Sequence, residues 1–179
     1  LTKRGSKDGL DVPMCGVPVQ SVDGYLARLI RAGHRVAICE QVEDPKEQKE
    51  RGGKGPLKRD VVRVLTPGTL TEDELLPTRA HNYLAALGRA ESEIAIAWAD
   101  MSTGDFLVQE ILDHELETTI ARLDPAELIF PFEFELPDWI IDSRTCTTEQ
   151  PTSLFDSTNA RKLLEQFYQV VSLDGLGNF

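Results

Sequence analysis

Apolar residues recur with a helical period in the first third of the chain. After Ser21, apolar side chains return every three or four positions, which predicts an amphipathic helix that starts at Ser21 and ends at Gly33. Arg35–Gln41 and Asp60–Leu65 are short apolar runs typical of buried strands. Between them, Asp44–Arg59 is rich in Lys, Glu and Gly, so we expect an unpacked, mobile loop that is either simply solvated or follows a phosphate backbone.

The pattern changes in the second half of the chain. Three strand-like runs separated by short polar turns predict an antiparallel meander over Asn82–Leu87, Ile94–Asp100 and Asp105–Ile111. A helix is expected over Asp113–Leu123, with Asp113 as its cap and Leu116, Ile120 and Leu123 facing inward. Glu127–Phe130 is then predicted as a buried strand parallel to the meander.

The last part of the chain contains shorter elements. Trp139–Ile141 and Arg144–Thr147 are interpreted as extended pieces, and Ser157–Val170 as a helix. The apolar face of this helix carries Ala160, Leu163, Leu164, Phe167 and Val171. The order of three meandering strands, helix, strand and helix predicts a ribonuclease-H-like sheet, so the expected class is α/β (α+β), with a small mixed α/β domain in front of that sheet.

Charge divides the chain near residue 70. Residues 1–70 contain 13 Lys and Arg against 9 Asp and Glu, a net charge of +4, whereas residues 71–179 contain 6 against 21, a net charge of −15. Pro67, Gly68 and Pro77 interrupt regular structure at the same place. We therefore predict two domains, 1–70 and 71–179, of which the basic first one is suited to lie against phosphate.

Composition restricts the compartment and the class of protein. The 179 residues, 41% of them hydrophobic, contain no apolar run long enough to span a membrane and no signal peptide. The three cysteines are widely spaced and form no CxxC pair, which favours free thiols in a reducing cytoplasm over disulfides or zinc. Because the sequence begins with Leu1 instead of Met, we expect it to be a fragment.

Few residues suggest catalysis. Asp100 stands at the end of a predicted strand with Asp105 close behind, where a nuclease of ribonuclease-H type would bind divalent metal. An acid before a Ser-Thr-Gly turn is more often a turn-capping residue. Gly52-Gly53-Lys54-Gly55 lacks the strand and the Ser or Thr of a phosphate loop, and the sequence contains no GxSxG or HExxH motif.

Several motifs in a fixed order resemble one family. In the first half they are Leu1–Gly5, Pro13–Pro18, Tyr25–Leu29, Val36–Gln41 with Asp44-Pro45, and Val61–Thr69. In the second half they are Asn82–Ala86, Asp100–Gly104 and Pro125–Leu128. Taken together over nearly the whole chain, they are similar to the MutS family of bacterial DNA mismatch-repair proteins.

The resemblance implies that the chain holds the later part of a mismatch-recognition domain and most of a connector domain. The family's Phe-x-Glu wedge motif would lie before Leu1, and Phe132–Glu135 does not fit it. The ATPase, with its ATP and Mg, and the clamp would lie after Phe179, so this fragment would carry no cofactor and no enzymatic activity. The implied partners are mismatched duplex DNA, MutL and, in the full-length protein, a second copy of the same chain.

Two sets of residues are candidate contact sites. Lys3 and Arg4 suit phosphate, while Met14, Gly16, Val17 and Pro18 offer apolar contacts and close approach to a bent minor groove. Core packing for Met14 and Val17, and an exposed terminus for Lys3 and Arg4, remain open alternatives. The outer side of the last helix, around Arg161, Lys162 and Glu165, is a candidate face for MutL. A metal-dependent nuclease and a nonspecific interaction module remain the alternative functions.

Overall fold

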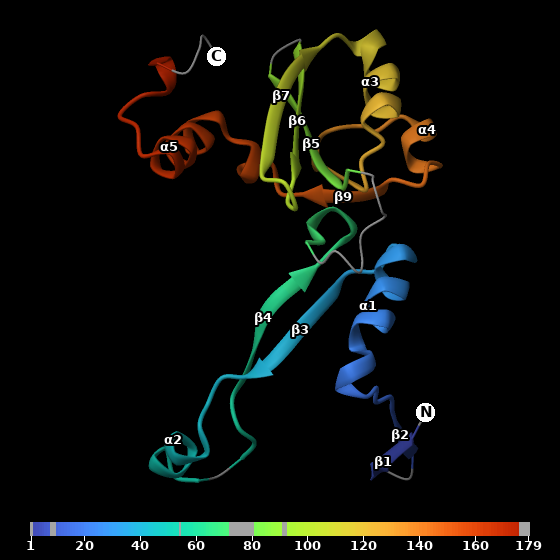
Figure 1. Ribbon diagram of the computed structural model, residues 1–179, viewed down its shortest axis with the longest axis vertical. Helices are drawn as coiled ribbons and strands as arrows, with labels where there is room; N and C mark the ends of the chain where they lie inside the picture. Colours follow the sequence, from blue (N-terminus) through green and yellow to red (C-terminus); the bar gives the residue numbers. More distant parts are fainter. Residues whose placement is uncertain (1, 8–9, 54, 72–80, 91–92, 176–179) are drawn as a thin grey trace. The chain divides into compact units, whose positions relative to one another are not determined.

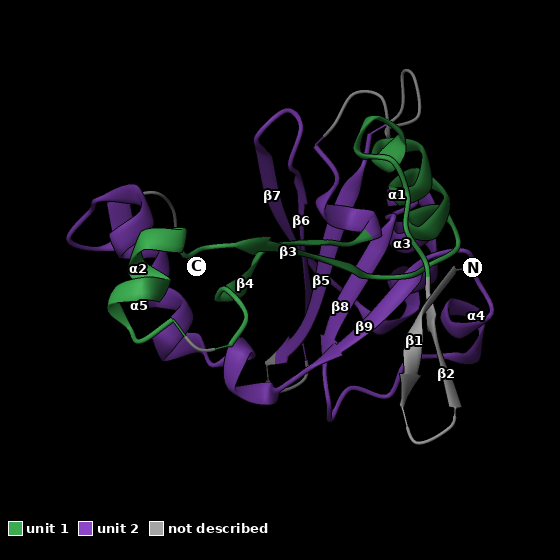
Figure 2. Ribbon diagram, turned by 90° about the horizontal axis from the view of Figure 1, so that it is seen from below, with its two compact units in different colours: residues 1–66, 72–76 green, residues 67–71, 77–179 purple. Residues whose placement is uncertain are grey.

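The chain forms two compact units. The computed structural model describes residues 2–7, 10–53, 55–71, 81–90 and 93–175, with side chains from Cys15 onward except that of Ala90. One unit comprises residues 1–66 and 72–76, and the other residues 67–71 and 77–179 (Figures 1 and 2). Each unit has its own β-structure, so we describe them separately.

The first unit contains two antiparallel strand pairs and two helices. Its elements are β1 (Thr2–Lys7), β2 (Leu10–Met14), the 3-10 helix η1 (Val19–Ser21), α1 (Val22–Arg31), β3 (Val36–Gln41), α2 (Pro45–Glu50) and β4 (Arg59–Leu65). β1 pairs with β2, and β3 pairs with β4. The two strands predicted from apolar runs are therefore confirmed as strands, but the prediction that they are buried is wrong, because Leu65 is the one buried residue in β3 and β4. The β1–β2 hairpin is an element that the apolar pattern did not reveal.

The predicted amphipathic helix is confirmed as α1. Ser21 stands at its N-cap, but its side chain makes no capping hydrogen bond, because η1 leads directly into the helix. At the other end, the Gly33 N–H donates to Ile30 O at 2.8 Å and the His34 N–H donates to Leu29 O at 3.0 Å. These two bonds form a Schellman motif, which requires the positive φ of +80° that Gly33 adopts.

The prediction of a loop over 44–59 is wrong for the first part of the segment, which forms helix α2, although this helix buries no side chain. Asp44 accepts a hydrogen bond from the Lys46 N–H at 2.9 Å, while Glu47 accepts one from the Asp44 N–H at 3.1 Å. This reciprocal capping box, with Pro45 at the first helical position, starts helix α2. Local capping therefore orders a polar segment that has no apolar face.

The second unit is built on a five-stranded sheet. Its elements are η2 (Pro67–Thr69), β5 (Tyr83–Ala90), β6 (Glu93–Asp100), β7 (Asp105–Ile111), η3 (Asp113–Glu115), α3 (Leu116–Leu123), β8 (Glu127–Pro131), α4 (Asp138–Ile141), β9 (Cys146–Gln150), η4 (Thr152–Phe155), α5 (Ser157–Tyr168) and η5 (Leu173–Gly175). The strand order is β7-β6-β5-β8-β9. Strands β5, β6 and β7 form the antiparallel meander, while β8 pairs parallel with β5 and β9 pairs parallel with β8. The predicted ribonuclease-H-like arrangement is confirmed.

One face of this sheet forms the core. Alternate residues of β6 are buried, which matches the period of a strand covered on one side. Figure 1 shows α3 and α4 on one side of the sheet and α5 on the other. The buried apolar residues of the core come from β5, β6, β7, β8, α3 and α4: Ala85, Leu87, Ile94, Ile96, Trp98, Ile111, Leu116, Ile120, Leu123, Leu128 and Ile140.

Two local predictions in this unit are wrong. Asp113 does not cap the helix that follows it; its carboxylate instead accepts a hydrogen bond from the Arg89 guanidinium at 2.8 Å. Trp139–Ile141 is not extended but belongs to helix α4, because Pro137 presets the first turn and its carbonyl accepts from the Ile140 N–H at 2.9 Å. The extended piece predicted at 144–147 corresponds to β9, which begins at Cys146.

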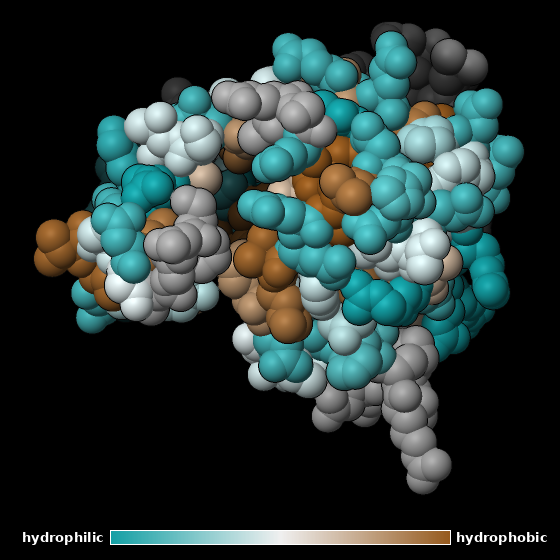
Figure 3. Space-filling model, turned by 90° about the horizontal axis from the view of Figure 1, so that it is seen from above, coloured by the Kyte–Doolittle hydropathy of each residue, from teal (hydrophilic) through white to brown (hydrophobic). Residues whose placement is uncertain are grey.

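Helix α5 is formed as predicted, but its apolar face is exposed. Leu163 is 66% exposed, Phe167 78% and Val171, just after the helix, 100%. Phe106 and Val108 on strand β7 are also more than half exposed. Figure 3 shows such hydrophobic residues at the surface, including a group at the outer end of the α5 segment. The second unit therefore carries apolar surface outside its core.

Candidate functional site

The predicted DNA-contacting residues lie in and just after the β1–β2 hairpin. The pairing places Lys3 opposite Pro13 and Thr2 opposite Met14, so the two parts of the predicted set become neighbours in the sheet. The chain then leaves β2 through Gly16 and Val17, both exposed. The side chains of Lys3, Arg4 and Met14 lie outside the described ones, so their contact with DNA stays a prediction.

Pro18 ends this stretch in a defined turn. It adopts an extended backbone with φ −60° and ψ 140°, and its carbonyl accepts from the Ser21 N–H at 2.9 Å. This turn starts η1 and then α1, so the hairpin, the exposed Gly16–Pro18 segment and the helix follow one another without a gap. Because Val17 is 39% exposed, it is not a core residue of the first unit.

The segment around α2 is closed at its base by one carboxylate. Glu43 accepts hydrogen bonds from the Lys58 N–H at 2.7 Å and from the Arg51 guanidinium at 2.9 Å. The backbone hydrogen bond from Lys58, assisted by Arg51, lowers the pKa of Glu43. At the tip, Gly52, Gly53 and Gly55 adopt positive φ angles. Glu43 therefore holds the two ends of the α2 segment together, and Arg51, one of the basic residues of this segment, is already paired with it.

Asp100 is a buried structural carboxylate at the end of β6. One oxygen accepts from the Ser102 N–H at 3.0 Å and the Ser102 hydroxyl at 2.6 Å, and the other lies 3.2 Å from His81 Nδ1 and 3.4 Å from the Asn82 N–H. Burial raises the pKa of Asp100, but these hydrogen bonds outweigh it and lower the pKa to about 2. The turn-capping interpretation of Asp100 is confirmed.

The metal-nuclease alternative gains no support. Asp105, the second candidate ligand, accepts a hydrogen bond from the Thr103 hydroxyl at 2.8 Å. In the part of the chain that the structure describes, no cluster of three or more His, Cys, Asp or Glu side chains could hold a metal ion.

A buried turn at residues 67–70 is held by hydrogen bonds to three polar side chains, directly or through one of them. The Gly68 N–H donates to Glu127 Oε2 at 3.2 Å, and the Thr148 hydroxyl donates to Glu127 Oε1 at 2.8 Å. The Asn82 side-chain amide donates to the Pro67 carbonyl at 2.9 Å. The turn is thus bonded to the starts of β5 and β8, and through Glu127 to β9.

Steric fit reinforces these bonds. A Cβ atom at Gly68 would lie 2.9 Å from Glu127 Cβ and 2.9 Å from Leu84 Cδ1, closer than real Cβ atoms approach. Of the five buried polar or charged residues among those described, four belong to this network or adjoin it: Asn82, Asp100, Glu127 and Thr148. Sequence reasoning missed this network, although Glu127, an acid at the head of an apolar strand, was a visible signal for it.

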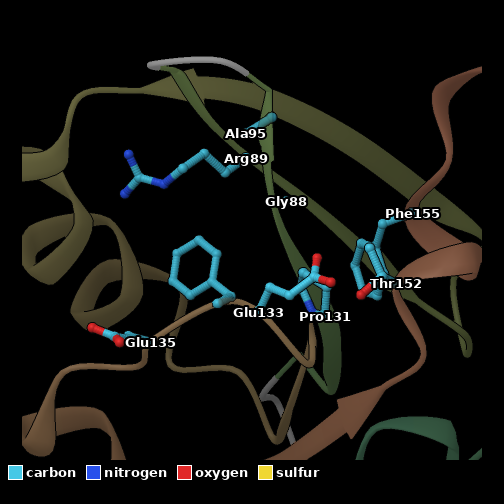
Figure 4. A pocket seen from close by; sticks show the side chains of 9 residues that line it. Gly88, Arg89, Ala95, Pro131, Glu133, Glu135, Thr152 and Phe155 are labelled. Atoms are coloured by element: carbon cyan, nitrogen blue, oxygen red, sulfur yellow. The ribbon is translucent and has the colours of Figure 1, made fainter.

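A hollow of about 730 Å³ opens near the distal ends of β5 and β8. Figure 4 shows Arg89 on one side, Phe155 and Thr152 on the other, and Gly88 behind them. Arg89 is paired with Asp113 and its guanidinium lies 5.6 Å from the centre of the Phe134 ring. Arg89, the cation among the residues that line the hollow, is thus already paired.

The candidate MutL-facing residues are on α5. Arg161 lies 3.6 Å from the Asp174 carboxylate, both groups being largely solvated. Lys162 is exposed and Glu165 is half-buried. None of the helices in the described ranges is long and apolar enough to cross a membrane.

The fold and the motifs together define a class: a recognition domain with a β-hairpin and a helix, followed by a connector of ribonuclease-H-like topology. Residues 1–74 match the family model for MutS domain I, and residues 82–178 match the model for MutS domain II. The chain belongs to the MutS family.

Curated relatives agree over the whole chain. It is 50% identical over 182 residues to the DNA mismatch repair protein MutS of Ruegeria pomeroyi, covering 100% of this chain and 21% of that protein. The MutS proteins of Dinoroseobacter shibae, at 47%, and Nitrobacter hamburgensis, at 48%, are matched over 100% and 98% of this chain and 20% of each relative. The chain therefore spans about one fifth of the length of these relatives.

Proposed function

We propose that this chain supplies the DNA-reading and connecting parts of a mismatch-repair protein. The observation that carries the proposal is the family match of both units, in order, together with about half of all residues identical to curated MutS proteins. In this role the first unit holds mispaired or looped-out duplex DNA, and the second passes the signal onward. The chain itself acts by binding and not by catalysis.

The first unit contributes sequence-independent contacts to DNA. A protein that kinks a duplex must recover an unstacking free energy of a few kcal/mol through contacts beside the kink. The exposed Gly16–Pro18 segment and the paired Lys3 strand next to it are arranged as such a flank, with a net charge of +4 in residues 1–70. We expect this binding to be mismatch-blind and sensitive to salt.

Titration of a labelled duplex with this chain at low salt tests the proposal. A dissociation constant of roughly 1–100 µM is expected, rising steeply with salt as counterions are released. The double variant Lys3→Ala with Arg4→Ala should weaken binding and reduce the salt slope by about two. The matched control, Arg161→Ala with Lys162→Ala in the acidic unit, should change neither. Absence of binding at about 100 µM would contradict the proposal.

The whole protein's chemistry is proposed from the same family membership. We expect ATP and Mg to bind a part of the protein outside this chain, and the protein to act as a homodimer in the cytoplasm. We place its contact with MutL on the outer side of α5, around Arg161, Lys162 and Glu165. Charge reversal by Lys162→Glu and Glu165→Lys should reduce MutL recruitment to mismatched DNA, and unchanged recruitment would remove this face from consideration.

A further inference from the structure

His81 and Asp100 form a side-chain pair that lies apart from the residues proposed to contact DNA or MutL. His81 stands just before β5, and its Nδ1 lies 3.2 Å from Asp100 Oδ2. The side chain of His81 is 60% exposed, whereas that of Asp100 is 2% exposed. The His81 ring also stacks on the Tyr83 ring, with 4.9 Å between the ring centres and 8° between the ring planes. A buried carboxylate and an aromatic ring therefore hold an exposed imidazole in one orientation.

The Asp100 carboxylate determines which nitrogen of His81 carries the proton. Hydrogen bonds lower the pKa of Asp100 to about 2, so at neutral pH the group is ionised and can only accept hydrogen bonds. His81 Nδ1 must therefore be the donor, and the neutral ring has its lone pair on Nε2. Within the described residues, Nε2 has no hydrogen-bond partner that would occupy this lone pair.

We infer that His81 Nε2 is a modification site that accepts acyl groups from small, uncharged donors. The Nε2 lone pair attacks the carbonyl carbon of the donor, the bond from that carbon to the leaving group breaks, and the leaving group departs with the electron pair of that bond. The ring is then a cation, which the Asp100 carboxylate stabilises through the Nδ1–H. Loss of the Nδ1 proton to water leaves a neutral acyl-imidazole. Asp100 acts through His81 and is thus a positioning residue.

Charge favours this class of donor. Residues 71–179 carry a net charge of −15, which repels anionic donors such as acyl phosphates and phosphoramidates. An uncharged acyl donor meets no such repulsion. His81 and Asp100 both belong to the second unit, so the inference does not depend on the DNA-binding role proposed for the first unit.

Treatment of the whole chain with diethyl pyrocarbonate, an uncharged acyl donor, tests the inference, with mass spectrometry of peptides giving the rate at each histidine. His34 and His114 are internal controls, because both are exposed and neither ring has a hydrogen-bonded carboxylate in the described part of the chain. Rates are measured between about pH 6 and 9, so that the plateau reports the neutral ring. We expect His81 to react about fivefold faster than either control at the plateau. An equal or slower rate would overturn the proposal.

Two variants distinguish the pair from a general loss of structure. In Asp100→Asn the carbonyl oxygen keeps the two hydrogen bonds from Ser102, so the NH₂ group faces His81 Nδ1 and the ring proton moves to Nε2. His81 should then lose its advantage over the two control histidines. The matched control, Ser102→Ala, removes a hydrogen bond to the other oxygen of Asp100 and should leave the rate at His81 unchanged. Equal losses of rate in both variants, or none in Asp100→Asn, would contradict the assigned role of Asp100.

A second measurement does not require the Asp100 variant to fold. A long-range proton–nitrogen correlation spectrum of the wild type, recorded at about pH 9, identifies the protonated nitrogen of each neutral imidazole. We expect the proton of His81 on Nδ1. A proton on Nε2 would show that the lone pair is not available to an acyl donor, and the proposal would then be wrong.

Discussion

Replacing Asp100 by Asn should destabilise the second unit in a way that depends on pH. The hydrogen bonds that outweigh burial lower the pKa of Asp100 from 3.8 to about 2. A shift of this size corresponds to about 2 kcal/mol of folding free energy. Since the folded-state pKa lies below the unfolded one, this stabilisation is present above pH 4 and is lost as the pH falls toward about 2.

Urea unfolding of the wild type and Asp100→Asn at a series of pH values measures this difference. The Asn side chain has the shape of the Asp side chain, but it has an NH₂ group in place of one carboxylate oxygen. This NH₂ group cannot accept the hydrogen bonds that His81 Nδ1 and the Asn82 N–H donate to the second oxygen of Asp100. We expect a gap of about 2 kcal/mol at pH 7 that narrows at pH 3 and closes near pH 2. Asp142→Asn, an exposed acid of the same unit, is the control. A gap that stays constant from pH 7 to pH 3 would refute the reasoning.

Three further predictions concern packing and helix ends. Gly33→Ala should destabilise the first unit by about 1 kcal/mol because Gly33 has φ +80°. Gly24→Ala should instead stabilise this unit by about 0.5–1 kcal/mol, because Gly24 lies inside α1 with open space around it. Thermal unfolding followed by circular dichroism distinguishes the two opposite effects. Ile140→Ala, fully buried, should cost about 3 kcal/mol in urea unfolding, while Ile141→Ala, 60% exposed, should cost under about 1 kcal/mol. Asp44→Ala removes the cap of α2 and should weaken that helix by about 1 kcal/mol, seen as faster amide exchange at Lys46, and unchanged exchange there would contradict the cap.

Apolar periodicity found the elements whose faces carry apolar residues and missed those that are stabilised locally. Helix α1, the strand pair β3–β4, the meander, α3 and β8 all have an apolar stripe or alternation. Helix α2 has six residues and no buried side chain, so it has no period to detect. Its signal was Asp44-Pro45 with Glu47, a capping pattern visible in the sequence.

The same limit explains the other misses. The β1–β2 hairpin was signalled by Asp8-Gly9 in the sequence, a dipeptide typical of tight hairpin turns, and not by hydrophobicity. The buried turn could not be predicted from local pattern, because Gly68 and Glu127 are 59 positions apart and only the sheet brings them together. Glu127, an acid at the start of an apolar strand, indicates that its carboxylate has a hydrogen-bond donor, but the sequence does not identify Gly68 as that donor.

The separation of Gly68 from Glu127 also fixes an order of events during synthesis. A ribosome makes the whole of β4 and the turn before it makes Glu127, 59 residues later, and Thr148 later still. At roughly 5–20 residues per second, several seconds pass between the synthesis of Gly68 and that of its acceptor, Glu127. Strands β3 and β4 are therefore complete before Glu127 is made, and they can pair while the Gly68 N–H still lacks the acceptor that the folded second unit gives it.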